Sequence, residues 1–321
     1  MVRNIVAIFN LYLDVYFYTC MKPKIFDVII IGGSYSGLSA AMALGRAIRT
    51  ILIVDSGTPC NLRTPYAHNF ITRDGEKPAS IARKAKEQVL NYPTTQFLKD
   101  EVLRAKKSAS GFELLTGHGI TLNTKKLLFT TGIRDIIPSI EGFSSCWGIS
   151  ILHCPYCHGY EVKDKKIGLL GHGKTGFELS RVLYSWSKDM ILFTNGESHL
   201  TKEQAWLLKK KNIPVIEQKF LSIEHLNGQI QFIHFTDGTT YQIDALFTKL
   251  PFEQQCNIPQ QLGVELTEQG FIKIDDFQRT NVTGIYAAGD NTTVFRAVSV
   301  ATAAGTKAGS FINRELIEEE F

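Results

Sequence analysis

The residues that decide the fold are IFDVIIIGGSYSG, at positions 25–37. The first seven are mostly β-branched or otherwise apolar, which predicts a strand buried on both faces. From Leu38 onward the composition changes to that of a helix, and residues 50–55 form a second short apolar run. The order of strand, glycine loop, helix and strand is that of a βαβ unit.

The glycines after the first strand predict a dinucleotide site. Gly32 permits a tight turn, the second glycine position of the fingerprint would bring the backbone close to a pyrophosphate, and Gly37 lets helix and strand pack closely; Gly33 adds a further glycine to the loop. The loop departs from G-x-G-x-x-G, because Ser34 occupies the middle glycine position. Asp55 follows at about the 20-residue spacing expected of a carboxylate that binds a ribose. We therefore favour nucleotide binding over a purely structural glycine turn.

The same pattern returns later in the chain. An apolar strand at residues 166–170 runs into a second glycine loop and a helical stretch, and a strand at residues 189–194 closes the unit. The loop matches G-x-G-x-x-G at Gly171, Gly173 and Gly176. We predict an α/β fold with two related Rossmann-like dinucleotide-binding domains.

The second loop lacks the usual signature for NADPH. A 2′-phosphate needs Arg or Lys just after the second strand of the unit, and residues 194–199 contain neither. Glu197 either binds a ribose or is a solvated turn carboxylate. This segment therefore argues against NADPH.

Further segments complete the outline. Residues 127–132 predict a strand that runs into a turn, and residues 229–235 alternate ahead of an Asp-Gly turn, which predicts a small antiparallel ribbon in the second domain. Residues 283–290 predict a late strand, and a small-residue helix at 298–311 follows it. We expect this tail to return to the first domain.

Composition excludes several classes of protein. The 321 residues are 44% hydrophobic and 21% charged, which argues against disorder and a coiled coil. The 35 basic and 31 acidic residues give a net charge of +4, and no basic run is longer than residues 209–211. Nucleic acid is therefore not an expected partner.

The N-terminal segment is set aside from the fold. Residues 5–20 are apolar, but Asn10 and Asp14 interrupt them, and they are shorter than the ~20 residues of a spanning helix. They also lack a small-residue cleavage pattern. We expect Met21 to be the functional start and residues 1–20 to be an upstream extension. A surface or partner segment and a membrane anchor are the alternatives, and no membrane association is expected.

The cysteines point to redox chemistry. Six are too few for a disulfide-stapled scaffold, and only Cys154 and Cys157 form a local pair, within HCPYCHGYE at residues 153–161. Two thiols three residues apart can close a small disulfide. Zinc is the main rival, but tetrahedral sites draw two ligand pairs from separated stretches, and no second pair exists here. We predict no metal; structural cysteines are the third alternative.

Two histidines flank the thiols. An imidazole with a pKa near neutrality is the natural group to move protons during thiol-disulfide exchange. We favour His158, which follows the second thiol, over His153, and a structural hydrogen bond is the alternative for either ring. His68 and His172 are weaker candidates.

The order of these motifs resembles the low-molecular-weight thioredoxin reductase family of flavoprotein disulfide oxidoreductases. The shared order is a glycine loop, a Thr-Gly strand end at 131–132, C-x-x-C, a second glycine loop, and GIYAAGD at 284–290. HCPYCHGYE and HNFITRDG, at 68–75, are most similar to the branch that includes dithiol oxidases of fungal and bacterial disulfide metabolites. The similarity extends from about residue 25 to the C-terminus.

The resemblance implies FAD, bound without a covalent link, and a nicotinamide, NADH or NADPH, on the second loop. The implied flavin residues are Gly32, Gly33, Ser34, Gly37, Asp55, Gly132, Gly289 and Asp290, and the implied nicotinamide residues are Gly171, Gly173 and Gly176. By the same analogy Cys157 faces the flavin, Cys154 attacks the substrate disulfide, and His158 stands where housekeeping members carry an acidic proton donor.

Two positions depart from the family pattern. The basic signature for the NADPH phosphate is replaced by FTNGE, at residues 193–197. The Arg-Gln pair after the late Gly-Asp appears as Arg296 and Ala297. The electron donor is therefore left open.

The resemblance also implies a domain order, with the second domain inserted in the first. The predicted ranges are an N-terminal extension at 1–20, the first part of the FAD domain at 21–136, the C-x-x-C and NAD(P)-type domain at 137–250, and the second part of the FAD domain at 251–321. We expect a cytoplasmic homodimer that acts as an FAD-dependent thiol-disulfide oxidoreductase on a thioredoxin-like protein or a small-molecule disulfide or dithiol. An oxygen-dependent dithiol oxidase and a non-catalytic flavin-binding redox module are the alternatives.

Overall fold

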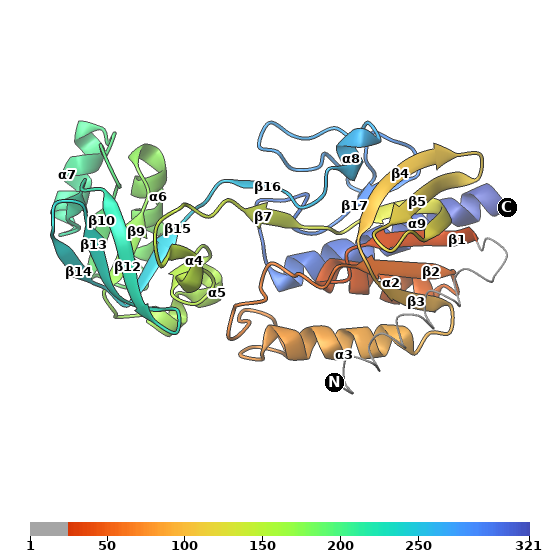
Figure 1. Cartoon of the computed structure of the whole chain (residues 1–321), viewed down its shortest axis with the longest axis horizontal. Coiled ribbons are helices and arrows are strands. Elements are labelled where there is room, and N and C mark those ends of the chain that lie inside the picture. The colour runs from red at the N-terminus through yellow and green to blue at the C-terminus, as the bar shows by residue number, and fades with distance from the viewer. Residues whose placement is uncertain (1–24) are drawn as a thin grey trace. The chain divides into compact units, whose positions relative to one another are not determined.

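A computed structural model of the chain describes residues 25–321, so the predicted extension at residues 1–20 lies outside the described residues. The described chain forms two compact units, each with its own sheet (Figure 1). The first unit comprises residues 25–59, 82–133 and 254–321, and the second comprises residues 60–81 and 134–253. Within residues 25–321 no helix combines the length and the apolar character needed to cross a membrane.

The first unit is built on a seven-stranded sheet of order β3-β2-β1-β6-β5-β4, with β17 also paired to β6. The central strands β3, β2, β1, β6 and β17 are parallel, whereas β4 and β5 are antiparallel. The bounds are β1 Ile25–Ile31, β2 Ile51–Asp55, β3 Thr95–Lys99, β4 Val102–Ser108, β5 Gly111–Thr116, β6 Thr121–Phe129 and β17 Ile285–Ala287.

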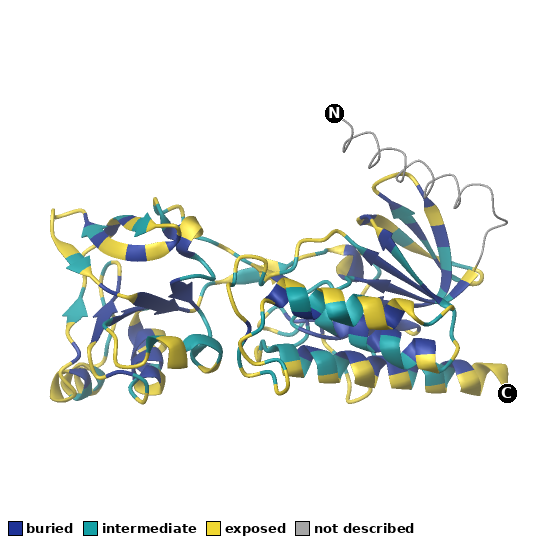
Figure 2. Ribbon diagram, turned by 90° about the horizontal axis from the view of Figure 1, so that it is seen from below, coloured by how far each residue is buried: buried dark blue, intermediate teal, exposed yellow. Residues whose placement is uncertain are grey.

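Both faces of this sheet are covered, which explains the continuous apolar run of β1. Val28 and Ile30 face a cluster formed with helices α2 (Tyr35–Arg46), α3 (Pro78–Leu90) and α9 (Val298–Glu320). The alternate residues of β1 face a second cluster, formed with β4, β5, the short helix α8 (Ile258–Gln261) and the chain that follows it. The buried strands of the sheet are dark blue in Figure 2.

Helices α2 and α9 approach each other closely because α9 carries glycine at the contact. A Cβ on Gly305 would overlap the carbonyl oxygen of Ser36, and a Cβ on Gly309 would lie 2.6 Å from the carbonyl oxygen of Ala40. The small-residue composition predicted for residues 298–311 therefore serves helix packing.

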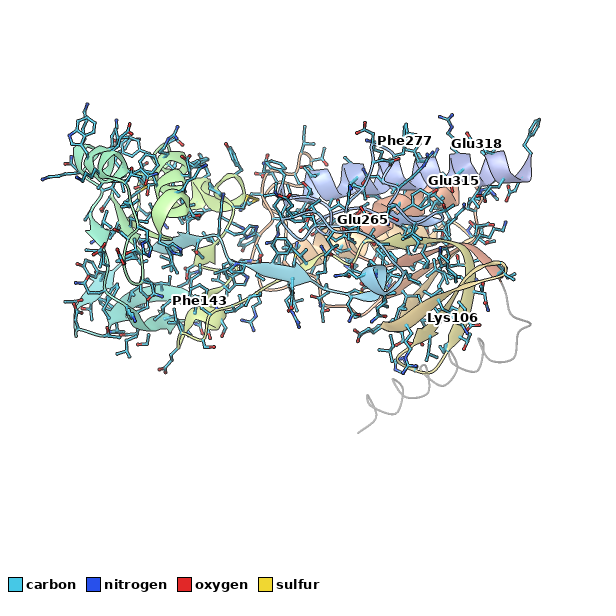
Figure 3. All side chains as sticks on the ribbon, turned by 90° about the horizontal axis from the view of Figure 1, so that it is seen from above. Lys106, Phe143, Glu265, Phe277, Glu315 and Glu318 are labelled. Carbon is cyan, nitrogen blue, oxygen red and sulfur yellow. A yellow bond between two sulfur atoms is a disulfide. The ribbon has the colours of Figure 1, made fainter. Side chains whose placement is uncertain are left out.

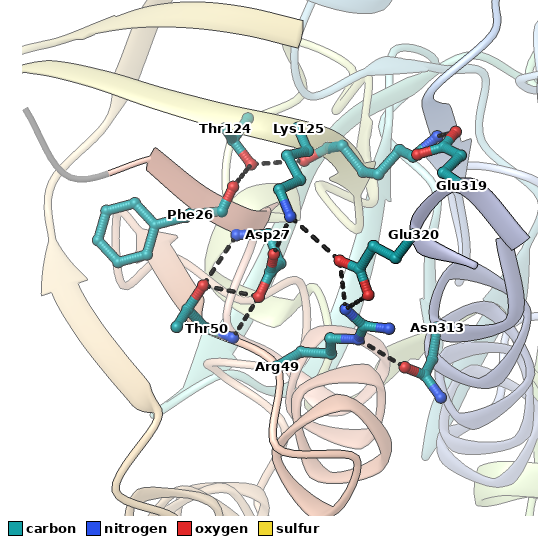
Figure 4. Close-up of polar contacts among 10 residues, drawn as sticks. Phe26, Asp27, Arg49, Thr50, Thr124, Lys125, Asn313, Glu319 and Glu320 are labelled. Carbon is teal, nitrogen blue, oxygen red and sulfur yellow. Dashed lines mark hydrogen bonds and ion pairs between the residues drawn. The ribbon is translucent and has the colours of Figure 1, made fainter. Parts of the chain in front are cut away.

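A charge network closes the unit at the amino ends of β1 and β2 (Figure 4). The Asp27 carboxylate accepts a hydrogen bond from the Thr50 amide at 2.8 Å and pairs with Lys125 at 2.8 Å. Lys125 also pairs with Glu320 at 3.2 Å, and Glu320 pairs with Arg49 at 2.7 Å. These contacts tie the last turn of α9 to the first strand.

A second group of charges lies nearer the core. Lys126 is almost fully buried and pairs with Glu315 at 2.7 Å and with Glu319. Glu315 also accepts a hydrogen bond from the hydroxyl of Tyr286, a fully buried residue of β17. Glu318, labelled beside Glu315 in Figure 3, pairs instead with Arg314 at 2.9 Å on the exposed side of α9.

The second unit contains a parallel sheet of order β11-β10-β9-β15-β8. The strands are β8 Ile151–Leu152, β9 Ile167–Leu170, β10 Met190–Phe193, β11 Val215–Ile216 and β15 Ala245–Thr248. Helices α6 (Gly173–Leu183) and α7 (Lys202–Lys210) follow β9 and β10. This order of elements is that of a second Rossmann-like unit.

An antiparallel ribbon packs on this second sheet. It has three strands, β12 Phe220–Leu226, β13 Gln229–Phe235 and β14 Thr240–Gln242. Phe193 of β10 contacts Phe220 and Phe235 of the ribbon, with ring centroids 5.6 and 5.5 Å apart. Phe143 of α4 (Phe143–Cys146), labelled in Figure 3, is fully buried in the same cluster.

The two units are joined in part by paired strands, β7 (Ile133–Asp135) and β16 (Phe252–Gln254). The predicted α/β fold class, with two Rossmann-like units, the second inserted in the first, and an antiparallel ribbon, is confirmed. Residues 60–81 leave the first unit and group with the second, a segment that the sequence-based ranges did not separate.

Candidate active site

The first nucleotide site lies where three parallel strands of the first unit end. Because β1, β6 and β17 are parallel neighbours, the loops that follow them meet at one edge of the sheet. Thr130 donates a hydrogen bond from its hydroxyl to the Gly32 carbonyl at 2.6 Å, which joins the first two loops. A Cβ on Gly289 would lie 3.0 Å from the Cβ of Ser36, which brings the third loop to the N-terminus of α2.

The glycine loop leaves no room for side chains. A Cβ on Gly37 would overlap the Gly32 carbonyl oxygen, and a Cβ on Gly33 would lie 2.9 Å from the Cβ of Asp55. The Asp55 carboxylate accepts a hydrogen bond from the Gly33 amide at 2.8 Å. Asp55 is therefore held beside the loop at the end of β2, where the sequence predicts a ribose.

Some buried polar atoms at this edge of the sheet make no hydrogen bond within the described residues. Within the described part of the chain, Ser36 Oγ, Thr131 Oγ1 and Asn291 Oδ1 are buried and have no hydrogen-bond partner. Ser36 lies in the first turn of α2, Thr131 follows β6 and Asn291 follows β17. Buried polar atoms are normally satisfied, so their gathering at one edge fits a polar ligand such as a dinucleotide. The N-cap residue of α2, Ser34, makes no side-chain capping bond, which leaves the first-turn amides of a 12-residue helix for a phosphate.

FAD thus has suitable residues in the first unit. The glycines and Asp55 fit the pyrophosphate and ribose, and the unpartnered atoms of Ser36, Thr131 and Asn291 extend the predicted set. None of these three residues is among those predicted from the sequence to bind the flavin. In the sequence they could have been found only because they lie next to Gly37, Gly132 and the Gly289-Asp290 motif. Asp290 itself lies 3.7 Å from the Arg296 guanidinium.

Residues of the loop after β10 contact the second glycine loop. Gly173 begins α6, and its amide donates a short hydrogen bond, 2.6 Å, to the carbonyl of Ser198. The rings of His172 and His199 stand edge to face, with centroids 6.1 Å apart. The loop after β10 therefore lies against the glycine loop and uses the Gly173 amide, which the fingerprint would offer to a pyrophosphate.

Two carboxylates lie at this loop: Glu197 belongs to it, and Glu217, which follows β11 (Val215–Ile216), bonds to it. The Glu217 carboxylate accepts a hydrogen bond from the Ser198 amide at 2.9 Å, and hydrogen bonding from Ser198 lowers the pKa of Glu217 below its ordinary value. Glu197 lies 3.8 Å from His199. With no Arg or Lys in residues 194–201, the loop offers carboxylates where a 2′-phosphate would need cations.

The dithiol lies in the second unit as a closed disulfide. Cys154 and Cys157 are bonded, with their Cα atoms 5.3 Å apart, across the single turn of α5 (Pro155–His158). The Cys154 carbonyl accepts hydrogen bonds from the amides of Cys157 and His158 at 3.3 and 3.2 Å. Gly159 ends the turn, and a Cβ there would lie 2.9 Å from the ring of Trp186.

His158 stands next to the second thiol in a partly buried position. Burial, and in second place the neighbouring His68, lower the pKa of His158 from 6.5 to about 4. Its ring is therefore neutral at physiological pH and can accept a proton from a thiol. His153 instead lies against Trp147, with ring centroids 6.0 Å apart. Among residues 25–321 no group of three or more His, Cys, Asp or Glu could hold a metal ion.

Two Rossmann-like units, one with a dinucleotide cradle and one with a redox-active Cys pair, define a nucleotide-dependent disulfide oxidoreductase. The sequence profile of the family described as pyridine nucleotide-disulphide oxidoreductase matches residues 26–305. The chain belongs to this family. The predicted resemblance to thioredoxin reductases, the oxidoreductase activity and the use of FAD with a nicotinamide are confirmed at this level.

Relatives named thioredoxin reductase and a solved structure are similar to this chain over most of its length. The chain is 31% identical to a Claviceps purpurea protein named thioredoxin reductase tcpT, over 92% of this chain and 96% of the relative. It is 29% identical to Aspergillus oryzae thioredoxin reductase aclD, over 94% and 99%. The crystal structure of a putative thioredoxin reductase TrxB from Bacillus anthracis superposes with a TM-score of 0.89 at 32% identity, covering 92% of this chain and all of that one.

The low pKa of His158 predicts an acid-sensitive fold. The folded state binds this proton only near pH 4, whereas the unfolded chain binds it near pH 6.5, so stability is lost as pH falls through this window. Between pH 7 and pH 5 we expect the free energy of unfolding to drop by about 2 kcal/mol on account of this group. Urea unfolding of the wild type and His158→Gln at both pH values measures the difference. An equal pH dependence in the two proteins would contradict the assignment.

Proposed function

We propose that Cys154 exchanges with the substrate, that Cys157 exchanges electrons with bound FAD, and that His158 handles the proton. The observation that carries this assignment is the closed Cys154–Cys157 disulfide with a partly buried, neutral imidazole directly after the second thiol. FAD, when bound, supplies or accepts the electron pair that opens or closes this disulfide. The enzyme is an FAD-dependent thiol-disulfide oxidoreductase that resembles thioredoxin reductase.

In the reductase direction the steps are those of thiol-disulfide exchange. The Cys154 thiolate attacks the substrate disulfide and forms a mixed disulfide, and one substrate sulfur leaves as a thiolate. Cys157 gives its proton to His158 and attacks the Cys154 sulfur. The Cys154–Cys157 disulfide closes and the second substrate sulfur leaves. His158 then returns its proton to one leaving thiolate and the other takes a proton from water, so the substrate disulfide is reduced by two electrons to a dithiol.

The substrate is a thioredoxin-like protein or a small-molecule disulfide or dithiol. Several relatives carry the name thioredoxin reductase, which supports a disulfide-bearing partner. Tyr156, between the two cysteines, is 61% exposed and offers an aromatic contact beside the disulfide. A homodimer in the cytoplasm is part of the same proposal, and its support is the family resemblance.

One observation favours the opposite direction of electron flow, from a substrate dithiol through the enzyme to oxygen. The loop after β10 uses the Gly173 amide and carries Glu197, and Glu217 after β11 bonds to it, so carboxylates stand where an NADPH phosphate would need cations. An enzyme that takes electrons from a substrate dithiol and passes them to oxygen needs no nicotinamide. We therefore propose an oxygen-dependent dithiol oxidase as the alternative to a reductase that uses NADH or NADPH.

Anaerobic stopped-flow absorbance separates the two directions. The FAD-loaded protein is mixed separately with NADPH, NADH and dithiothreitol, and the flavin band is followed. We expect dithiothreitol to bleach it, and we expect NADPH to be slower than NADH because residues 194–201 lack a cation for its phosphate. Bleaching by dithiothreitol alone, with recovery in air, favours the oxidase. A flavin that none of the three bleaches would contradict both directions.

A further inference from the structure

Gln254 is a polar residue of the first unit to which the proposed function assigns no role. It is the last residue of β16, and with it the chain returns from the second unit to the first. Its side-chain nitrogen donates hydrogen bonds to the carbonyls of Gly270 at 2.8 Å and Asn291 at 3.1 Å. Its side-chain oxygen Oε1 is buried and has no hydrogen-bond partner among residues 25–321.

The orientation of this side-chain amide is fixed by its partners. An amide nitrogen carries two hydrogens and accepts none, so the end that meets two carbonyl oxygens must be the nitrogen. The two bonds use both hydrogens. A turned-over amide would instead bring Oε1 against the carbonyl oxygens of Gly270 and Asn291. Gln254 therefore offers one buried acceptor and has no donor left beside it.

The end of β16 is bonded to two loops of the edge where the nucleotide site lies. The Gln255 amide donates to the Gly132 carbonyl at 3.3 Å, in the loop that follows β6. The Gln254 side chain reaches the Asn291 carbonyl, in the loop that follows β17. Gln254 thus stands beside the two loops that carry the unpartnered side-chain oxygens of Thr131 and Asn291.

Asn291 shows the same arrangement as Gln254. Its side-chain nitrogen donates to the Phe129 carbonyl at 2.9 Å, whereas its side-chain oxygen is buried without a partner among the described residues. The amide oxygens of Gln254 and Asn291 accept and cannot donate, so neither can satisfy the other. Since buried acceptors are normally satisfied, both need donors from outside the described chain.

The order of the strands at this edge gives the order of the cofactor along it. The parallel strands run β2, β1, β6 and β17, each beside the next. Asp55, at the end of β2, is placed for a ribose, and the glycine loop after β1 is placed for the pyrophosphate. FAD continues from its pyrophosphate into the ribityl chain and the flavin ring. The next strand ends, those of β6 and β17, would therefore hold the flavin half.

We propose that Gln254 is a further FAD-binding residue, whose Oε1 accepts a hydrogen bond from the flavin half of the cofactor. That half carries suitable donors, namely the ribityl hydroxyls and the ring N–H between the two flavin carbonyls. The inference rests on the FAD site that the proposed function uses, and it is independent of the roles proposed for Cys154, Cys157 and His158. It extends the site from the loops of the sheet to the strand β16. A buried water is the rival donor.

The test is Gln254→Ala in the full-length protein, with FAD affinity as the readout. The protein is freed of FAD and titrated with it, and the change in flavin fluorescence gives the dissociation constant. We expect this constant to rise about tenfold, which corresponds to the loss of one hydrogen bond. Gln254→Met keeps the length of the side chain but has no amide oxygen, and we expect the same loss.

Competition with ADP locates the effect within the cofactor. ADP carries the adenosine and pyrophosphate of FAD without the flavin, so it tests the end of the site at Asp55 and the glycine loop alone. We expect Gln254→Ala to bind ADP as the wild type does, which also shows that the first unit is folded in the variant. Asp55→Asn, in contrast, is expected to weaken the binding of both ADP and FAD.

The matched control is Gln255→Ala, at the next residue of the chain. The Gln255 side chain is exposed, and its contact with the Gly132 carbonyl is made by the backbone amide, which the substitution keeps. The dissociation constants for FAD and ADP should both equal those of the wild type.

Three results would overturn the inference. An FAD constant of Gln254→Ala equal to that of the wild type would assign the acceptor to a water. An equal loss for ADP and FAD would show a general loosening of the unit, and a loss in Gln254→Ala but not in Gln254→Met would show an effect of packing. Failure of the proposed function looks different, because the wild type itself would then bind no FAD.

Discussion

Replacement of Cys154 by serine is expected to lower the rate of disulfide exchange at least about a thousandfold, since a hydroxyl is neither a thiolate nucleophile nor able to close the disulfide. The protein's own disulfide joins Cys154 to Cys157 across one short turn, so no other sulfur takes part in it. The rate is measured with a chromogenic aromatic disulfide in the presence of the electron donor identified by stopped flow. FAD content and thermal unfolding should match the wild type.

Two further cysteine variants sharpen this result. Cys157→Ser keeps the attacking thiol and removes the resolving one, so we expect a stable mixed disulfide between Cys154 and the substrate, visible by intact-protein mass spectrometry. Cys60→Ser is the control, because Cys60 is exposed and lies outside the disulfide. A Cys157→Ser protein whose mixed disulfide forms elsewhere than on Cys154 would reverse the proposed roles of the two thiols.

Substitution of Gly37 by alanine is expected to give a protein without FAD. Its Cβ would overlap the Gly32 carbonyl oxygen and lie 2.8 Å from Thr130 Oγ1, both of which are backbone or buried groups that cannot simply turn aside. The glycine loop would have to move away from α2, which removes the cradle for the pyrophosphate. We expect a loss of about 3 kcal/mol or more in the free energy of unfolding, as for other overpacked cores.

The flavin content of the purified variant, from its absorbance ratio, and its urea unfolding curve measure the two effects. Ser39→Ala is the matched control: it adds no atom, lies two residues further along the same helix, and exchanges a residue for a better helix former. It should bind FAD like the wild type. Full flavin occupancy in Gly37→Ala would show that the cofactor does not depend on this loop.

The parts of the fold that were predictable are those written in local sequence. The strand expected at residues 25–31 coincides with β1, because its buried faces and its glycine loop are adjacent in the chain. Strands β4 and β5 were not predicted. Most of β4 is exposed on an antiparallel extension, so its sequence, VLRAKKS, carries little apolar signal. The ribbon has three strands, of which the sequence predicted only β13; β12 and β14 were not singled out.

In the candidate site, too, residues in contiguous motifs could be predicted, whereas residues that only the fold brings together could not. The glycines and the Cys pair were visible because each motif is contiguous. Thr131 and Asn291 gain their meaning only when the ends of β6 and β17 meet that of β1. His68 was ranked as a weak candidate, because nothing in its own segment announces that residues 60–81 join the second unit beside Glu161.

The first unit is built from separate segments of the chain, and this affects how the protein folds during its synthesis. The helix face of its sheet is completed by Ala308, Ile312 and Leu316 of α9, and its last strand begins only at residue 285. While the ribosome is still translating the second unit, Val28 and Ile30 have been synthesised, but the part of their cover that α9 supplies has not. The second unit can therefore condense first, and the nascent chain carries an open apolar surface until the end of synthesis, the stage at which it depends most on chaperones.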